Sequence, residues 1–164
     1  MIRYARLASP LGPLLAIAHD DAVAALHFVD GKYAPAIRPD WREDPDHSPL
    51  RRLGTQLAEY FAGRRTAFDL PLAPSGTDFQ RRVWREIAKV PPGRTTTYAA
   101  IAARAGAAGS ARAAGAATGR NPLSIVVPCH RIVASSGALT GYAGGLDRKR
   151  RLLALEGAAV KQSA

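Results

Sequence analysis

The sequence changes character at Pro74-Ser75-Gly76, and this change divides the 164-residue chain into two dissimilar parts. Before it, short apolar runs alternate with turn residues, whereas after it apolar residues recur at the spacing of a helix face. A chain of this length suits one large domain or two small domains that share an interface. We therefore predict one domain in residues 1–76 and a second in residues 77–164.

The first part predicts a small antiparallel sheet followed by a helix. Its strand-like runs are separated by turn residues and cover residues 2–9, 14–19 and 23–29. Residues 31–48 are rich in Pro and Asp and indicate a loop. Ser48 and Pro49 then supply an N-cap and a proline at the first helical position, and Gly63 is placed to end that helix. Residues 66–72 are a candidate for one more strand.

Helical patterns dominate the second part. Thr77 and Gln80 have the spacing of a capping box. The apolar stripe of the helix that follows consists of Phe79, Val83, Trp84, Ile87 and Val90. Two short helices joined by a glycine-containing turn come next, the first capped by Thr97 and the second by Ser110. Such a pair is a helix-turn-helix candidate, although similar pairs occur in proteins that never meet DNA.

The second helix of this pair consists almost entirely of Ala and Gly. Only Arg112 is long enough to reach the edges of bases, and a helix that reads sequence needs several such side chains. One interpretation is a helix that packs tightly against a neighbour. The other is a smooth face that lets the backbone approach DNA without reading its sequence.

The positive charge of the chain is concentrated in the second part. Residues 1–77 carry nine Lys or Arg and nine Asp or Glu, whereas residues 78–164 carry fourteen against four and so hold the whole excess of +10. An even spread would indicate an ordinary solvated surface. Concentration in one half is the electrostatic pattern expected for contact with phosphates.

The single cysteine, Cys129, excludes an internal disulfide, and it argues against a cysteine-rich zinc site. No apolar run approaches the ~20 residues that a membrane span needs, and the amino terminus has no secretory pattern. We therefore expect a cytoplasmic protein without membrane contact, in a reducing environment where the thiol stays free.

Cys129 stands beside His130 after a strand-like run of residues 125–127. A lone cysteine is more often an inert buried residue than a nucleophile, and a lone histidine is more often structural. Neighbours on a strand point to opposite faces, so coupling of the two side chains needs a bend or a bridging water molecule.

The string Pro128-Cys129-His130-Arg131 stands within an ordered set of further motifs. These are Thr77-Asp78-Phe79-Gln80, Val83-Trp84, Pro92-Gly93, Thr97-Tyr98, Asn121, Ser135-Ser136-Gly137-Ala138, Gly141-Tyr142-Ala143-Gly144-Gly145-Leu146, Lys149, Leu152-Leu153 and Glu156-Gly157. The whole set resembles the O6-alkylguanine-DNA alkyltransferases, also called methylated-DNA–protein-cysteine methyltransferases. The resemblance is close over residues 77–157 and looser before them. It implies an α/β protein with a ribonuclease-H-like N-terminal domain and a winged helix-turn-helix C-terminal domain.

The resemblance also implies catalytic roles. Cys129 matches the alkyl acceptor. Glu156 and His130 match a relay in which Glu orients His, and His draws the thiol proton through a water molecule, because only a thiolate attacks an alkyl carbon usefully. We expect this relay to lower the pKa of Cys129. Tyr98 matches the tyrosine that contacts the guanine ring and helps the leaving base accept a proton. Asn121 matches the residue that stiffens the turn between the DNA-binding helix and the active-site strand.

Further residues match the DNA-binding surface and the base pocket. Arg112 matches the arginine that fills the gap left by a nucleotide rotated out of the stack. The other expected DNA contacts are Thr97, Ser110, Ala113 and Arg131. The expected pocket residues are Val127, Pro128, Tyr142 and Ala143, and residues 137–145 form the pocket lip. At Ala143 the family often has Ser, but the contact expected there comes from the backbone N–H to guanine O6.

Some members of the family carry zinc in the first domain. This chain lacks the cysteines that such a site needs, so we predict no metal and no cofactor.

The function that follows is repair of double-stranded DNA carrying alkylated guanine, by a monomer. The alkyl group moves from guanine O6 to Cys129, with O4-alkylthymine as a less efficient substrate. The thioether product has no good leaving group, which predicts a single turnover. Two alternatives stay open: a DNA-binding regulator, which leaves Glu156 without a role, and a cysteine hydrolase, which leaves the basic half unexplained.

Overall fold

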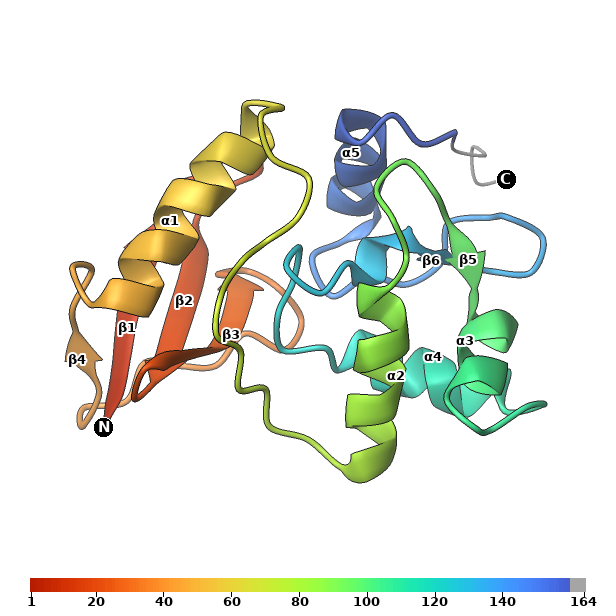
Figure 1. The fold of residues 1–164 in the computed structure, drawn as a ribbon, viewed down its shortest axis with the longest axis horizontal. Coiled ribbons are helices and arrows are strands. Elements are labelled where there is room, and N and C mark those ends of the chain that lie inside the picture. Colours follow the sequence, from red (N-terminus) through yellow and green to blue (C-terminus); the bar gives the residue numbers. More distant parts are fainter. Residues whose placement is uncertain (160–164) are drawn as a thin grey trace.

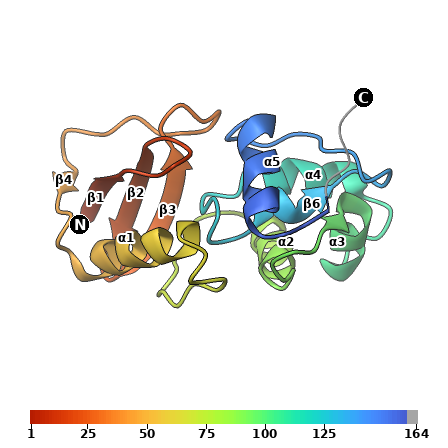
Figure 2. The same ribbon diagram turned by 90° about the horizontal axis from the view of Figure 1, so that it is seen from above.

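The computed structural model describes residues 1–159 and places a β-rich part beside a helical part (Figures 1 and 2). The predicted α/β fold, with a sheet-plus-helix first part and a helical second part, is confirmed. Residues 160–164, the end of the predicted second domain, lie outside the described residues. In the part of the chain that is described, no helix is long and apolar enough to cross a membrane.

A four-stranded sheet with the order β3-β2-β1-β4 forms the first part. Its strands are β1 (Ile2–Leu7), β2 (Leu14–His19), β3 (Ala22–Phe28) and β4 (Arg42–Glu43). The first three pair antiparallel, as predicted, with ends that differ by one or two residues. β4 pairs parallel to β1 within the segment predicted to be a loop, and it consists of only two residues.

Helix α1 (Ser48–Phe61) covers one face of this sheet (Figure 1). Its stripe of Leu50, Leu53 and Leu57 is buried in the same core cluster as the inner residues of the strands. The predicted N-cap is one residue off: Ser48 begins the helix, and His47 precedes it without a side-chain capping bond. Such a shift at a helix end is small, and the proline does stand in the first turn, where its missing N–H costs nothing.

Helix α2 (Asp78–Ala88) opens the second part with the predicted capping box. The Gln80 N–H donates to Thr77 Oγ1 over 3.1 Å, and the Thr77 N–H donates to Gln80 Oε1 over 3.0 Å. Trp84 is buried and its indole Nε1 donates to the Ala117 carbonyl over 2.8 Å. This bond connects α2 to the second helix of the helix-turn-helix pair.

Further helices and a second sheet follow α2 in the chain. They are β5 (Thr96–Thr97), α3 (Tyr98–Arg104), α4 (Ala111–Gly119), β6 (Ile132–Val133) and α5 (Leu146–Leu155). Thr97 Oγ1 accepts the Ala100 N–H over 3.1 Å and so caps α3 as predicted. In α4, Ala114 and Ala117 are buried while Arg112 and Ala113 are exposed. The small residues therefore do pack against a neighbour, and the other face of the helix stays open.

Two predicted strands are wrong, and instead Leu72 and Leu123 make single bridges to the outer edge of β3. Within residues 66–72 only Leu72 makes a single bridge, to Val23, and residues 125–127 form a turn in which Ile125 has a φ of 73°. Leu123 makes a similar bridge to Leu26. An edge strand presents unpaired backbone groups, and these segments satisfy them without forming a ladder.

The connection between the two parts lies just ahead of α2. Residues 73–77 contain no helix or strand, and α2 begins at Asp78. We propose the boundary between residues 76 and 77 as the border of the two domains. The segment around Leu123, which bridges to Leu26 of β3, then joins the second domain to the sheet of the first.

Candidate active site

Cys129 begins a short 3-10 turn, η1 (Cys129–Arg131), and is only 6% exposed. It borders a cavity of about 60 Å³ enclosed by α3, α4, the turn before η1 and the lip. The cavity is lined by Tyr98, Gly115, Thr118, Gly119, Asn121, Ser124, Cys129, Gly141, Tyr142 and Ala143. Among the described residues, no group of three or more His, Cys, Asp or Glu side chains is placed to hold a metal ion.

Behind the cysteine, the Glu156 carboxylate is buried among four donors. Its Oε2 accepts from His130 Nε2 over 2.8 Å, from the Tyr60 hydroxyl over 2.6 Å and from Arg131 Nη2 over 2.8 Å. Its Oε1 accepts from Arg131 Nε over 2.9 Å. The Glu156 side chain is 3% exposed and His130 is fully buried. Glu156 is therefore no surface carboxylate but the centre of a buried ionic cluster.

The protonation of this cluster follows from its contacts. Burial alone would raise the pKa of Glu156, but hydrogen bonds from His130, Arg131 and Tyr60 outweigh it and hold that pKa at about 2. Burial lowers the pKa of His130, although Glu156 opposes this. A neutral His130 that donates from Nε2 leaves Nδ1 as an acceptor. Nδ1 is buried and has no hydrogen-bond partner within residues 1–159.

The thiol itself is not activated at rest. Burial raises the pKa of Cys129, and a hydrogen bond with Asn121 and the charge of Lys149 offset this only in part. The expectation of a lowered cysteine pKa is therefore wrong for the thiol as the structure holds it, because burial dominates. A base must remove the proton before the sulfur can attack.

Asn121 holds the turn that leads to the cysteine. Its Nδ2 donates to the carbonyls of Leu123 and Val127 over 3.3 and 2.8 Å, and its Oδ1 accepts the Leu123 N–H over 3.0 Å. These bonds bridge both ends of a turn that contains the left-handed Ile125. The turn, rather than the predicted strand, delivers Cys129 to the cavity.

Tyr98 and the lip make another part of the cavity wall. The Tyr98 hydroxyl donates to the Thr140 carbonyl over 3.0 Å, and burial raises its pKa. Tyr142 and Ala143 also line the cavity, so these predicted pocket residues do lie beside Cys129. Lys149 Nζ reaches the lip from α5 and donates to the carbonyls of Thr140 and Gly141 over 2.8 and 3.1 Å.

Two residues of the site were not assigned a role from the sequence. Tyr60 comes from α1 and donates to Glu156 across 96 positions of the chain, a contact that no local pattern indicates. Lys149 is fully buried, and burial lowers its pKa to about 8. Its position three residues after Leu146 and three before Leu152, on the apolar face of a helix, is a signal that could have identified it.

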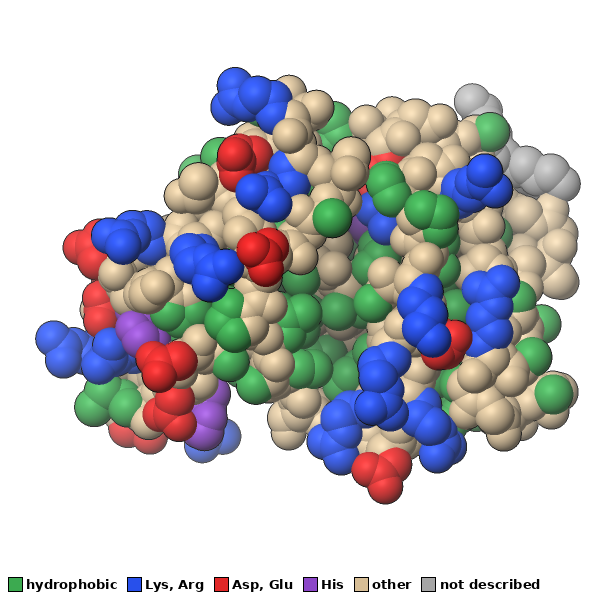
Figure 3. Space-filling view, viewed as in Figure 1, with side chains coloured by type: hydrophobic (Ala, Val, Ile, Leu, Met, Phe, Trp, Pro, Cys, Tyr) green, Lys and Arg blue, Asp and Glu red, His purple; other side chains and the backbone are tan. Residues whose placement is uncertain are grey.

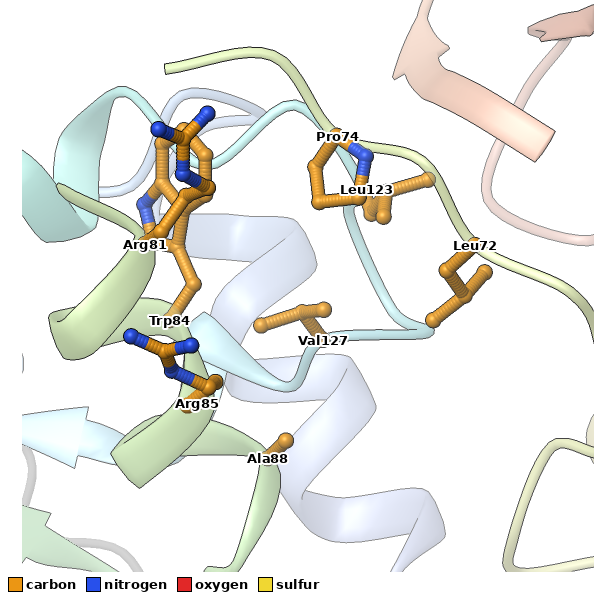
Figure 4. Close-up of a pocket in the computed structure, with 8 residues that line it drawn as sticks. All are labelled: Leu72, Pro74, Arg81, Trp84, Arg85, Ala88, Leu123 and Val127. Carbon is orange, nitrogen blue, oxygen red and sulfur yellow. The ribbon is translucent and has the colours of Figure 1, made fainter. Parts of the chain in front are cut away.

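The structure overturns three predicted assignments. Arg131 cannot contact DNA, since it is buried and its guanidinium is bound to Glu156 and, through Nη1, to the Val90 carbonyl over 2.6 Å. Val127 and Pro128 do not line the cysteine cavity. Val127 instead lies in a separate groove of about 280 Å³ beside Trp84 (Figure 4).

The predicted DNA contacts other than Arg131 lie around α4. Arg112 and Ala113 are exposed, Ser110 is the N-cap residue of α4 without a side-chain capping bond, and Thr97 is half-buried at the cap of α3. Figure 3 shows Lys and Arg gathered over α2, while both signs are mixed over the first part. The positive excess is therefore a property of the helical part in space as well as in sequence.

Family models match both parts of the chain. Residues 2–74 match the ribonuclease-like domain of the 6-O-methylguanine DNA methyltransferases, and residues 78–158 match their DNA binding domain. The chain is a DNA-binding methyltransferase of the kind that repairs DNA. It belongs to the methylated-DNA–protein-cysteine methyltransferase family, as the resemblance predicted, and the alternatives of a regulator or a hydrolase are excluded.

Individual relatives support the same assignment. A methylated-DNA–protein-cysteine methyltransferase of Mycolicibacterium paratuberculosis is 49% identical over 156 residues, which cover 95% of this chain and 93% of the relative. The crystal structure of Mycobacterium tuberculosis O6-methylguanine methyltransferase has a TM-score of 0.87 at 45% identity, covering 96% of this chain and 93% of that one. A structure of the M. tuberculosis protein in complex with DNA has a TM-score of 0.86 at 44% identity, covering 94% and 92%.

The buried cluster predicts a specific response to acid. Because the pKa of Glu156 is about 2 in the fold and about 4.5 without its partners, its stabilisation is complete above roughly pH 5 and is lost as the pH falls toward 2. Glu156→Gln should lower the free energy of unfolding at pH 7 by about 3 kcal/mol, since it leaves Arg131 without its buried partner. Denaturant unfolding at pH 7, 4 and 3 should show this difference shrinking as the pH falls.

The control for this prediction is Asp69→Asn. Asp69 forms an exposed ion pair with Arg52, its side chain being 94% exposed, so its loss should leave the free energy of unfolding nearly unchanged. A difference between wild type and Glu156→Gln that stays constant from pH 7 to pH 3 would contradict the role given to the cluster.

Proposed function

We propose that the protein removes the alkyl group from O6-alkylguanine in duplex DNA, and less efficiently from O4-alkylthymine, onto Cys129. The observation that carries this proposal is the buried His130, which stands next to the single cysteine and whose Nε2 donates to Glu156. Its Nδ1 has no hydrogen-bond partner among residues 1–159. Such an arrangement supplies a base for a thiol whose pKa burial has raised.

The reaction is an in-line displacement at the alkyl carbon. His130 Nδ1 takes the thiol proton through a bridging water molecule, and Cys129 sulfur attacks the carbon. The bond from that carbon to O6 breaks, its electron pair goes to the guanine, and Tyr98 helps the leaving base accept a proton. The thioether that remains has no good leaving group, so each molecule reacts once.

Guanine must leave the base stack to reach a buried thiol. Extrusion of a nucleotide costs a few kcal/mol of lost stacking and pairing. Arg112 is exposed on α4 and fills the vacated space, while the small residues around it let the helix backbone approach the duplex. The structure of the related M. tuberculosis protein in complex with DNA supports DNA as the partner. The monomeric state and the cytoplasmic location stay predictions.

The first test is direct detection of the transferred group. After incubation with duplex DNA containing O6-methylguanine, intact-protein mass spectrometry should show one added methyl group in place of a proton, on the peptide that holds Cys129. Cys129→Ser is the control and should remain unmodified. Repeated turnover by one protein molecule, or a methyl group on another residue, would contradict the proposal.

The second test concerns His130. His130→Gln should react with free O6-benzylguanine roughly a hundredfold more slowly at neutral pH, since it loses a general base. Its rate should rise with pH more steeply than that of the wild type, because alkali supplies the thiolate that the relay no longer generates. Single-turnover rates between pH 6 and 10 measure this. If the pH–rate profile of His130→Gln runs parallel to that of the wild type, His130 does not act as the base in the relay.

The third test separates base flipping from chemistry. Arg112→Ala should slow the repair of duplex DNA by roughly tenfold, as expected for the loss of part of a few-kcal/mol effect. Its rate with free O6-benzylguanine should be unchanged, because a free base needs no extrusion. Arg51→Ala, exposed on α1 in the part of the chain without excess positive charge, is the matched control and should behave as wild type on both substrates. Equal slowing of Arg112→Ala on both would place Arg112 in the fold or the chemistry.

A further inference from the structure

Arg148, the third residue of α5, joins the sheet of the first part to the lip. Its Nε donates to the Leu11 carbonyl over 2.8 Å, and its Nη1 donates to Asp30 Oδ1 over 2.7 Å and to the Gly144 carbonyl over 3.2 Å. Its guanidinium lies 4.3 Å from the centre of the Phe28 ring. The side chain is 16% exposed. We call these contacts the clasp.

The lip packs closely against the same end of the sheet. The Lys32 N–H donates to the Ala143 carbonyl over 2.9 Å. A Cβ at Gly144 would lie 2.8 Å from both the Phe28 and the Tyr142 rings, a distance that side chains do not tolerate. The position of the lip is therefore set by the first part of the chain as well as by α5.

The clasp fixes the orientation of successive peptide groups in the lip. A trans peptide is planar, so fixing the carbonyl of one residue fixes the direction of the next N–H. Arg148 holds the Gly144 carbonyl and thereby orients the Gly145 N–H, which donates to the Tyr142 carbonyl over 2.9 Å. That bond in turn orients the Ala143 N–H, which donates no hydrogen bond within residues 1–159.

We infer that Arg148 is a positioning residue that aims the backbone N–H of Ala143 at the bound base. The inference rests on the proposed function, together with the contact that the resemblance implies between this N–H and the O6 atom of guanine. It gives the first part of the chain a role in recognition of the base, since Leu11 and Phe28 anchor the arginine.

Arginine suits this role because its planar fork donates in several fixed directions while its face lies on an aromatic ring. Lysine is a compact point charge that cannot hold Leu11, Gly144 and the Phe28 face together. The ion pair with Asp30 matters less, since the Asp30 side chain is 72% exposed and solvent screens it. The two carbonyls and the ring are therefore the important partners.

The test compares two reagents on the full-length protein. Arg148→Met keeps much of the side-chain length but removes all donors, and it should raise the half-saturating concentration of free O6-benzylguanine about tenfold, the equivalent of one hydrogen bond. The maximal rate should change less. Alkylation of Cys129 by iodoacetamide needs no base recognition and should stay within twofold of wild type. Arg148→Lys should fall between Arg148→Met and wild type. Arg151→Met is the control, exposed on the same helix, and should match wild type.

Each other outcome decides against the inference. Parallel loss of reactivity toward iodoacetamide and O6-benzylguanine would show that Arg148 supports the fold or the thiol. A lowered melting temperature with unchanged O6-benzylguanine kinetics would show that it only joins the two parts. A wild-type protein that reacts with neither O6-benzylguanine nor alkylated DNA would overturn the proposed function together with the inference. If the wild type reacts with both and Arg148→Met reacts with O6-benzylguanine just as well, only the inference is overturned.

Discussion

The burial of the Glu156 carboxylate is the constraint on which the rest of the site depends. A buried carboxylate is tolerated only when it is fully paired, and Glu156, at the end of α5, finds its partners on α1 and η1. Tyr60 connects the sheet-plus-helix part to the cluster, while His130 and Arg131 connect it to the cysteine turn. The same ion that orients His130 therefore also fixes how the two parts of the chain meet.

This arrangement keeps the thiol of Cys129 protonated, and therefore weakly nucleophilic, until a base removes its proton. Burial keeps Cys129 protonated, and the neighbouring positive charge of Lys149 does not reverse that. A resting thiol is protected from adventitious alkylation and oxidation, which attack the thiolate. In the single-turnover reaction that we propose, each stray reaction would consume a molecule, so a protonated resting thiol is an advantage.

The lip is held by two positively charged side chains that donate hydrogen bonds to its backbone carbonyls. Lys149 binds the carbonyls of Thr140 and Gly141, and Arg148 binds that of Gly144. Because these carbonyls are tied on one side, the peptide N–H groups between them keep a fixed direction. A glycine-rich segment, which would otherwise cost much conformational entropy to order, becomes a rigid wall of the cavity.

The sequence by itself determined the two-part division, the antiparallel strands, the capped helices and the family, because periodicity, capping residues and ordered motifs are local signals. It also identified Cys129, His130 and Glu156 as candidates. Only the tertiary structure decided that Arg131 faces Glu156 instead of DNA and that residues 125–127 turn instead of extending. The physical reason is that ion pairing and edge coverage depend on groups far apart in the chain, such as Tyr60 and Glu156, whose meeting no local pattern encodes.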